Sequence, residues 1–227
     1  MKMFKALTAS VVMAAAVMAA SASQASTLIS DFTLDGSSSG LKGDAPYGQV
    51  TVDDAGGVLA FTVTLDDGLK FRKAPDSNHY SFSFNLGGQA ATISDLADNG
   101  TGTFTAVRGS VNQSPFGTFQ LAVDCTSSTC SKGYSDKSPD ILTFTVSAAT
   151  ALTVDDLTKS SKGEYFAADV ADWKGHTGNI GANIVSITRT STPGAVPEPA
   201  TWAIMLMGFG GLGAMLRQRR GMALIRA

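Results

Sequence analysis

The sequence has 227 residues, with 17 Lys and Arg against 19 Asp and Glu and a formal net charge of −2. The first 25 residues hold two lysines, and the last 31 hold four arginines and one glutamate, so the remainder has 11 basic and 18 acidic side chains, a net of −7. About 170 residues are enough for one domain with its own core. A surface this acidic repels polyanions and excludes nucleic acid as a partner.

The chain begins with the pattern of a secretory signal peptide over residues 1–25. Two lysines precede a short alanine-rich apolar run, and small residues follow it. These are the basic, apolar and cleavage regions of an exported precursor. We predict export through the Sec translocon and cleavage between Ala25 and Ser26. The alternatives are cleavage after Ala22 and a retained N-terminal membrane anchor.

Residues 26–190 alternate apolar and polar side chains in short runs that are rich in β-branched and aromatic residues. A period of two is typical of strands with one buried and one exposed face. Strands are predicted at residues 27–34, 49–52, 58–65, 80–86, 91–94, 104–106, 119–123, 142–146, 165–170 and 182–190, with a helical turn at 153–157. Turn sequences separate these runs. We therefore predict an all-β domain, a single antiparallel β-sandwich that is jelly-roll-like, flanked by an N-terminal signal helix and a short C-terminal membrane helix.

The two cysteines, Cys125 and Cys130, lie five positions apart in a Ser/Thr-rich loop. In an exported protein this spacing predicts a disulfide. A free thiol pair and a metal site are the alternatives, and a metal site would need further ligands that the neighbouring sequence does not supply.

Aspartates recur at the predicted turns, and carboxylate and carbonyl oxygens are the ligands that Ca²⁺ prefers. We predict no cofactor, with a structural calcium site in one loop as the alternative. The best candidates for that site are Asp95, Asp98 and Asn99. Aspartate is also an ordinary turn residue, so the pattern suits a site without requiring one.

Trp173 is the only tryptophan between the two ends of the chain. The commoner role of such a tryptophan is to pack a loop onto the sandwich, with its ring half buried. The alternative, suggested by the polar residues beside it, is stacking on a sugar ring together with Tyr165 or His176.

The end of the chain has an unusual order of parts. Residues 191–196 read as a linker, and residues 197–227 begin with two prolines that keep the segment extended. A tryptophan, a short glycine-containing apolar run and several arginines follow, an arrangement that suits a membrane surface with positive charge on the cytoplasmic side. The residues of this candidate signal are Pro197, Glu198, Pro199, Trp202, Gly208, Arg217, Arg219 and Arg220.

This arrangement resembles the PEP-CTERM sorting signal, in its PEPxxWA form, of exported proteins in Gram-negative bacteria. The resemblance implies that the apolar run holds the protein transiently in the inner membrane, at roughly 24 Å too short for a lasting span. It also implies that an exosortase-type membrane enzyme reads the Pro-Glu-Pro segment and removes the tail. The interrupted arginine run, with Gln218 inside it and seven residues after it, departs from the usual pattern.

Proteins with this signal accompany exopolysaccharide production. The resemblance therefore implies a non-enzymatic protein of the cell surface or extracellular matrix, with exopolysaccharide as a partner. A carbohydrate-binding module is the first alternative. A β-sandwich hydrolase is the second, and it requires two carboxylates, or a serine with His79 or His176, to converge in one cleft.

Overall fold

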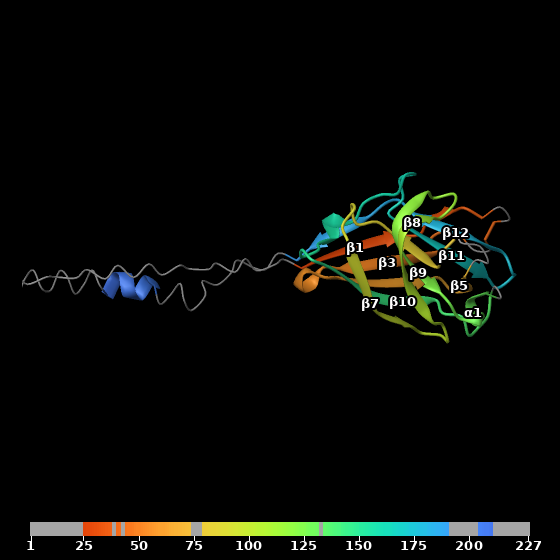
Figure 1. Ribbon diagram of the computed structural model, residues 1–227, viewed down its shortest axis with the longest axis horizontal. Helices are drawn as coiled ribbons and strands as arrows, with labels where there is room; N and C mark the ends of the chain where they lie inside the picture. The colour runs from red at the N-terminus through yellow and green to blue at the C-terminus, as the bar shows by residue number, and fades with distance from the viewer. Residues whose placement is uncertain are drawn as a thin grey trace, which may run out of the picture.

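The computed structural model describes residues 25–37, 40–41, 44–73, 79–131, 134–190 and 204–210. Strands account for 49% of the structure and form two antiparallel sheets packed face to face, as Figure 1 shows. The predicted all-β sandwich is confirmed.

The first sheet has six strands in the order β13-β1-β3-β4-β10-β7. Their bounds are Ser26–Asp31 for β1, Gly48–Asp53 for β3, Leu59–Leu65 for β4, Ala91–Asp98 for β7, Ile141–Ala148 for β10 and Ser186–Arg189 for β13. In β4 every second residue is buried, so its apolar side chains face the second sheet while its alanine and threonines face solvent.

The second sheet has seven strands, six in the order β2-β12-β11-β6-β9-β8 and β5 paired with β11. Their bounds are Leu34–Asp35 for β2, Leu69–Phe71 for β5, Phe82–Phe84 for β6, Phe104–Asn112 for β8, Thr118–Cys125 for β9, Phe166–Asp172 for β11 and Thr177–Ala182 for β12. Three short helical turns complete the sandwich: η1 Ala55–Gly57, α1 Ser128–Ser131 and η2 Val154–Asp156. All seven residues of β11 are buried, so other parts of the chain cover its outer face as well.

A cluster of phenylalanines joins the two sheets. Phe61 of β4 stacks on Phe144 of the same sheet, with ring centroids 4.6 Å apart. Across the interface its centroid lies 4.8 Å from that of Phe84 and 6.3 Å from that of Phe166. Phe61 is 2% exposed, and the other three rings of this group are buried as well. Such ring pairs add to the apolar area that the sheets bury, so Phe61 is the central residue of the core.

A second, smaller cluster lies on the outer face of the seven-stranded sheet, where the turn between β8 and β9 folds over it. Its buried members are Val111, Phe116, Phe119, Ala122 and Ala167. The ring of Phe116 lies so close to Gly181 that a Cβ there would approach it to 2.8 Å. Buried Gln113 ties this turn down, since its side chain accepts a hydrogen bond from the Tyr80 N–H and donates one to the Tyr80 carbonyl.

Both ends of the sandwich lie at the same edge of the molecule. β1 pairs with β13, and the N–H of Thr190 donates to the carbonyl of Ala25. β4 begins near this edge and runs for seven residues, or about 20 Å, to Leu65 at the opposite end of the sandwich. Leu65 leads into the turn that carries Gly68. Figure 1 places β5, α1 and the β11–β12 pair toward that far end.

Two of the predicted strands need correction, and β12 was not predicted. The strand predicted over 27–34 is two strands, β1 and β2, which belong to different sheets. The strand predicted over 182–190 starts where β12 ends, and only its second half is the strand β13. β12 itself escaped prediction because Gly178 and Gly181 interrupt its pattern. Both glycines lie where another segment crosses closely, and a Cβ at Gly178 would meet that of Ser37 at 2.3 Å.

Residues 204–210 form a helix whose residues are all exposed. Among the residues that the structure describes, no helix has the length and apolar character needed to cross a membrane. The remainder of the predicted C-terminal helix and the predicted signal helix lie outside the described residues.

We predict that Phe61→Ala lowers the free energy of unfolding by about 3–5 kcal/mol, because it leaves a cavity where the two sheets meet. Phe61→Leu retains most of the apolar volume and should cost less. Urea unfolding of the purified chain, followed by tryptophan fluorescence, measures both. Ile184→Ala, at a side chain that is 74% exposed, is the control and should change the stability by less than about 0.5 kcal/mol. A Phe61→Ala effect as small as that of the control would contradict this role.

Candidate functional site

An open groove lies beside the turn that joins β11 to β12, at the end of the sandwich opposite its termini. Its volume is about 540 Å³. The residues that line it are Arg72, Ser131, Tyr134, Trp173, Lys174, Gly175 and Thr177. Trp173 is 59% exposed, which is unusual for the largest apolar side chain. Part of the ring is covered by the turn that carries Gly68, and the remainder is open to solvent.

The turn that presents Trp173 is organised by the carboxylate of Asp172, which is fully buried. One oxygen accepts the N–H groups of Lys174 and His176 at 2.9 and 2.8 Å. The other lies 2.7 Å from Nδ1 of His176. Together with a hydrogen bond from the Trp173 N–H to the Gly68 carbonyl, 3.1 Å long, these contacts fix the backbone on both sides of the indole.

One edge of the indole rests on Gly68. A Cβ at that position would lie 2.9 Å from Cδ1 of Trp173, and the backbone of Gly68 has φ +87°. Glycine is therefore favoured both by the close contact and by the backbone conformation. The ammonium of Lys174 lies 4.7 Å from the centroid of the indole ring. A cation–π contact at an exposed site is worth about 0.5–1 kcal/mol, so a ligand can displace the ammonium from the ring at little cost.

A second cavity, of about 320 Å³, adjoins the groove and shares Arg72 and Thr177 with it. Asp169, which is 1% exposed, lies at its floor, and its carboxylate is 3.6 Å from Nη1 of Arg72. Nε of Arg72 is buried and has no hydrogen-bond partner in the structure. The guanidinium therefore sits between the two hollows with one donor still to be satisfied.

The wall of the groove opposite the hairpin is built around the disulfide between Cys125 and Cys130. The carbonyl of Cys130 accepts the N–H of Lys73, which places the segment carrying Arg72 against α1. The hydroxyl of Ser138 donates to the carbonyl of Thr129 in the same helical turn. The disulfide thus fixes α1, whose last residue, Ser131, lines the groove with Trp173.

Asp124 lies in β9, next to this wall. One of its carboxylate oxygens is buried without a hydrogen-bond partner. Burial raises the pKa of the Asp124 carboxyl above its ordinary value, although the charge of Lys73 and hydrogen bonds from Ser81 and Cys125 oppose that shift. The charged form is therefore the less favourable one in the folded protein.

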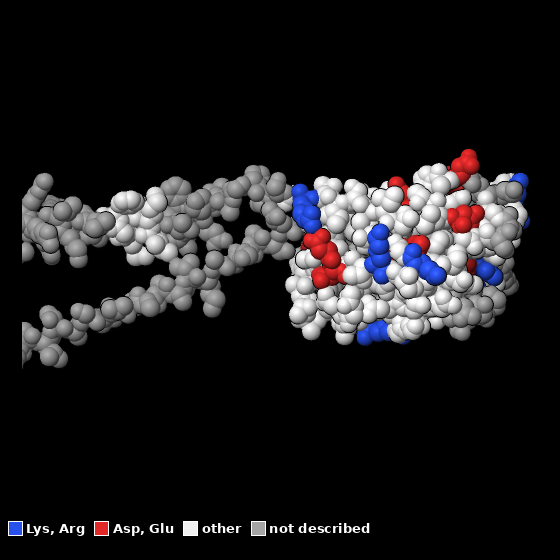
Figure 2. All heavy atoms as spheres, turned by 90° about the horizontal axis from the view of Figure 1, so that it is seen from above, with Lys and Arg blue, Asp and Glu red and all other residues white. Residues whose placement is uncertain are grey.

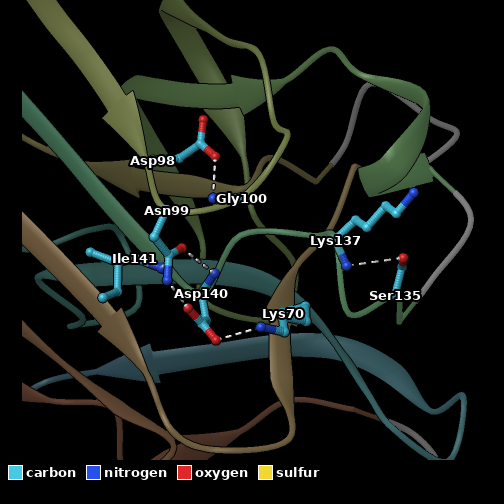
Figure 3. Close-up of polar contacts among 8 residues, drawn as sticks. All are labelled: Lys70, Asp98, Asn99, Gly100, Ser135, Lys137, Asp140 and Ile141. Atoms are coloured by element: carbon cyan, nitrogen blue, oxygen red, sulfur yellow. Dashed lines mark hydrogen bonds and ion pairs between the residues drawn. The ribbon is translucent and has the colours of Figure 1, made fainter.

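The candidate calcium ligands do not converge on a common point. Figure 3 shows Asp98 directed at the N–H of Gly100, which it accepts at 2.8 Å, while the amide of Asn99 faces Asp140 and Ile141. Asp95 has φ 53° beside the bulge between β7 and β10, and it accepts a hydrogen bond from its neighbour Ser94. Within the described part of the chain, no group of three or more His, Cys, Asp and Glu side chains is placed to hold a metal ion.

The Asn99 contact belongs to a small ionic network. Asp140 accepts hydrogen bonds from Asn99 and from the ammonium of Lys70. Burial alone would raise the pKa of the Asp140 carboxyl, but these two hydrogen bonds and the charge of Lys70 hold it below its ordinary value. Asn99 thus links the end of β7 to the start of β10 through Asp140.

Of the two partners suggested for Trp173, neither lines the groove. Tyr165 precedes β11 at its other end, where Lys159 lies 5.2 Å from its ring centroid. His176 belongs to the same hairpin turn but faces Asp172. The aromatic side chain that does line the groove is Tyr134, which the sequence could have indicated only through its closeness to the disulfide loop.

The predicted processing residues lie at or beyond the edges of the structure. Ala25 is exposed, and the N–H of Ser26 donates to the buried carboxylate of Asp54. Gly208 lies in the exposed helix over 204–210. The others, Pro197, Glu198, Pro199, Trp202, Arg217, Arg219 and Arg220, lie outside the described residues.

Comparison with known families bears on this part of the chain. A profile of the PEP-CTERM protein-sorting motif matches residues 195–220. The chain carries a PEP-CTERM sorting signal. The signal marks an exported protein that passes through a membrane-held intermediate and is processed by an exosortase-type enzyme. The searches of curated proteins and of solved structures yielded no match.

We predict that Asp124→Asn raises the melting temperature at pH 7 and leaves it unchanged near pH 3. A carboxyl whose pKa is higher in the folded than in the unfolded protein destabilises the fold as the pH rises above about 3.9, the pKa that the group has in the unfolded chain. The neutral amide removes that destabilisation, whereas in acid the carboxyl is already neutral in both states. Thermal unfolding of both proteins at the two pH values tests this. Asp67→Asn, at an exposed turn, is the control, and destabilisation by Asp124→Asn at pH 7 would contradict the prediction.

Proposed function

We propose that the chain is a non-enzymatic protein of the cell surface or extracellular matrix, associated with exopolysaccharide and delivered there by its sorting signal. The observation that carries the proposal is the sorting motif at residues 195–220, which begins six positions after the end of β13. In this proposal the Sec translocon exports the chain, and the C-terminal segment holds it in the inner membrane until it is processed.

The arrangement of the sandwich is compatible with this route. Ala25 and Thr190 are hydrogen-bonded neighbours, so the signal peptide and the sorting signal both attach at one end of the domain. The groove beside Trp173 lies at the other end. While the C-terminal segment holds the protein, the groove would point away from the membrane and remain accessible.

A non-enzymatic role is favoured by the bonding of the acidic and basic groups near the groove. Asp169 faces Arg72, and Asp172 faces His176. Acid–base catalysis requires a carboxyl or imidazole that can reach the reacting atom. Ser37 and His79 line the cavity next to the groove together, but the buried hydroxyl of Ser37 is hydrogen-bonded to no base among the described residues.

Carbohydrate binding is the second candidate function, and the exposure of Trp173 favours it. An exposed indole above a groove lined by hydroxyl groups offers an apolar face with polar partners around it, the usual composition of a site for a small polar ligand. Another hollow on the sandwich, beside the β8–β9 pair, suits this role less well. The amides of Asn85 and Gln120 line it, and both already bind backbone groups of the adjacent turn and strand.

We predict that Glu198→Ala shifts the protein from the surface and medium fractions to the inner membrane, because the processing enzyme would no longer read the Pro-Glu-Pro segment. The experiment expresses the full chain in a Gram-negative host that makes an exosortase-type enzyme, and quantifies the protein in each fraction by immunoblotting.

Asp67→Ala, which removes an exposed carboxylate from a turn of the sandwich, serves as the control and should leave the distribution unchanged. An unchanged distribution for Glu198→Ala would contradict the proposed route. A wild-type protein confined to the inner membrane would contradict the proposed surface or matrix location.

A further inference from the structure

The groove beside Trp173 differs in charge from the domain that carries it. The domain is acidic as a whole, and Figure 2 shows acidic and basic side chains interspersed on one of its faces. The described lining of the groove contains two cationic side chains, Arg72 and Lys174, and no acidic one. The carboxylates of Asp169 and Asp172 beneath it are buried and face Arg72 and His176. The described charged side chains that line the groove are therefore cationic.

We propose that this groove binds an acidic carbohydrate, with Trp173 stacking on a sugar ring and Arg72 and Lys174 binding its carboxylate. The inference rests on the second candidate function, carbohydrate binding, and names the class of sugar. A guanidinium and an ammonium both bind carboxylates by charge-assisted hydrogen bonds. Arg72 lines the groove, and its side chain is 20% exposed, so a ligand in the groove can contact it.

The contacts of Trp173 also give the site a direction. Its Gly68 edge adjoins Asp66 and Asp67, both exposed, whose charges repel a carboxylate. The cations lie on the groove side of the indole, and Lys174 lies over the ring itself. A sugar that takes the place of the ammonium over the ring leaves that ammonium free to bind the carboxylate. The acidic group of the ligand thus points into the groove, toward Arg72.

The hydroxyl groups of the lining suit the remainder of such a ligand. Tyr134 and Thr177 each carry a hydroxyl that can donate and accept hydrogen bonds, whereas the hydroxyl of Ser131 already donates to the carbonyl of Ser128 and can only accept. Ser131 ends α1 and Thr177 begins β12, so separate elements bring hydroxyl groups to the groove that Trp173 borders.

The test uses the purified exported chain and isothermal titration calorimetry. The probes are oligomers of galacturonate, of glucuronate and of mixed mannuronate and guluronate, each compared with its carboxyl-reduced, neutral counterpart. We expect at least one uronate oligomer to bind at least about tenfold more tightly than its neutral counterpart. Added salt should weaken that binding, because it screens exposed charges.

Two variants and one control locate the binding. Trp173→Ala should weaken it by at least about tenfold through the loss of stacking, and Lys174→Gln by about tenfold through the loss of a charge-assisted bond. Both side chains are exposed, so the fold is retained. Lys159→Gln removes the ammonium over Tyr165, a similar cation–π pair at the other end of β11, and should leave the affinity unchanged.

The outcomes separate the two levels of the proposal. Equal binding of acidic and neutral oligomers that Trp173→Ala abolishes would overturn the preference for acidic sugars and leave carbohydrate binding in place. Binding that survives Trp173→Ala would overturn this groove as the site. Failure of every oligomer to bind the wild-type chain would overturn both the acidic-sugar proposal and the carbohydrate-binding candidate, without affecting the sorting route.

Discussion

The packing of phenylalanine rings between the two sheets is the interaction on which the rest of the structure depends. Phe61 contacts rings from both sheets at centroid distances of 4.6–6.3 Å, and every strand that contributes a ring is fixed relative to the others by it. The long-range pairing of β1 with β13, which closes the domain, depends on this packing. With the core in place, the outer face of the seven-stranded sheet becomes a stable surface on which loops can be arranged.

That outer face carries the two features that distinguish this sandwich. The turn between β8 and β9 covers one part of it, and Gly181 of β12 allows this close approach. The hairpin from β11 to β12 borders the uncovered part and presents Trp173, held by the buried Asp172 carboxylate. Beneath the groove, Asp169 faces Arg72 and Asp172 faces His176. The distance of the groove from the termini suits a domain that is held at the opposite end.

The sequence predicted the architecture well where burial alone determines it. The alternation in β4, with every second residue buried, identifies a strand without knowledge of its partners. The strand β12 could not be predicted, because its glycines are required by close contacts with Phe116 and Ser37, which are distant in sequence. The sorting signal, a linear motif read by another protein, was recognisable from residues alone. The groove was not, since Arg72, Tyr134 and Trp173 come together only through the disulfide and the pairing of β5 with β11.

The central claim is that this chain is a sorted cargo, a sandwich that is delivered after both of its ends have been processed. The most direct test is the intact mass of the protein recovered from the cell envelope and the medium of a host with an exosortase-type enzyme. The account predicts a mass that lacks residues 1–25 and the segment that follows the Pro-Glu-Pro sequence. A mass that still includes the apolar and arginine-containing tail, in every fraction, would contradict it and indicate a protein that keeps its membrane segment.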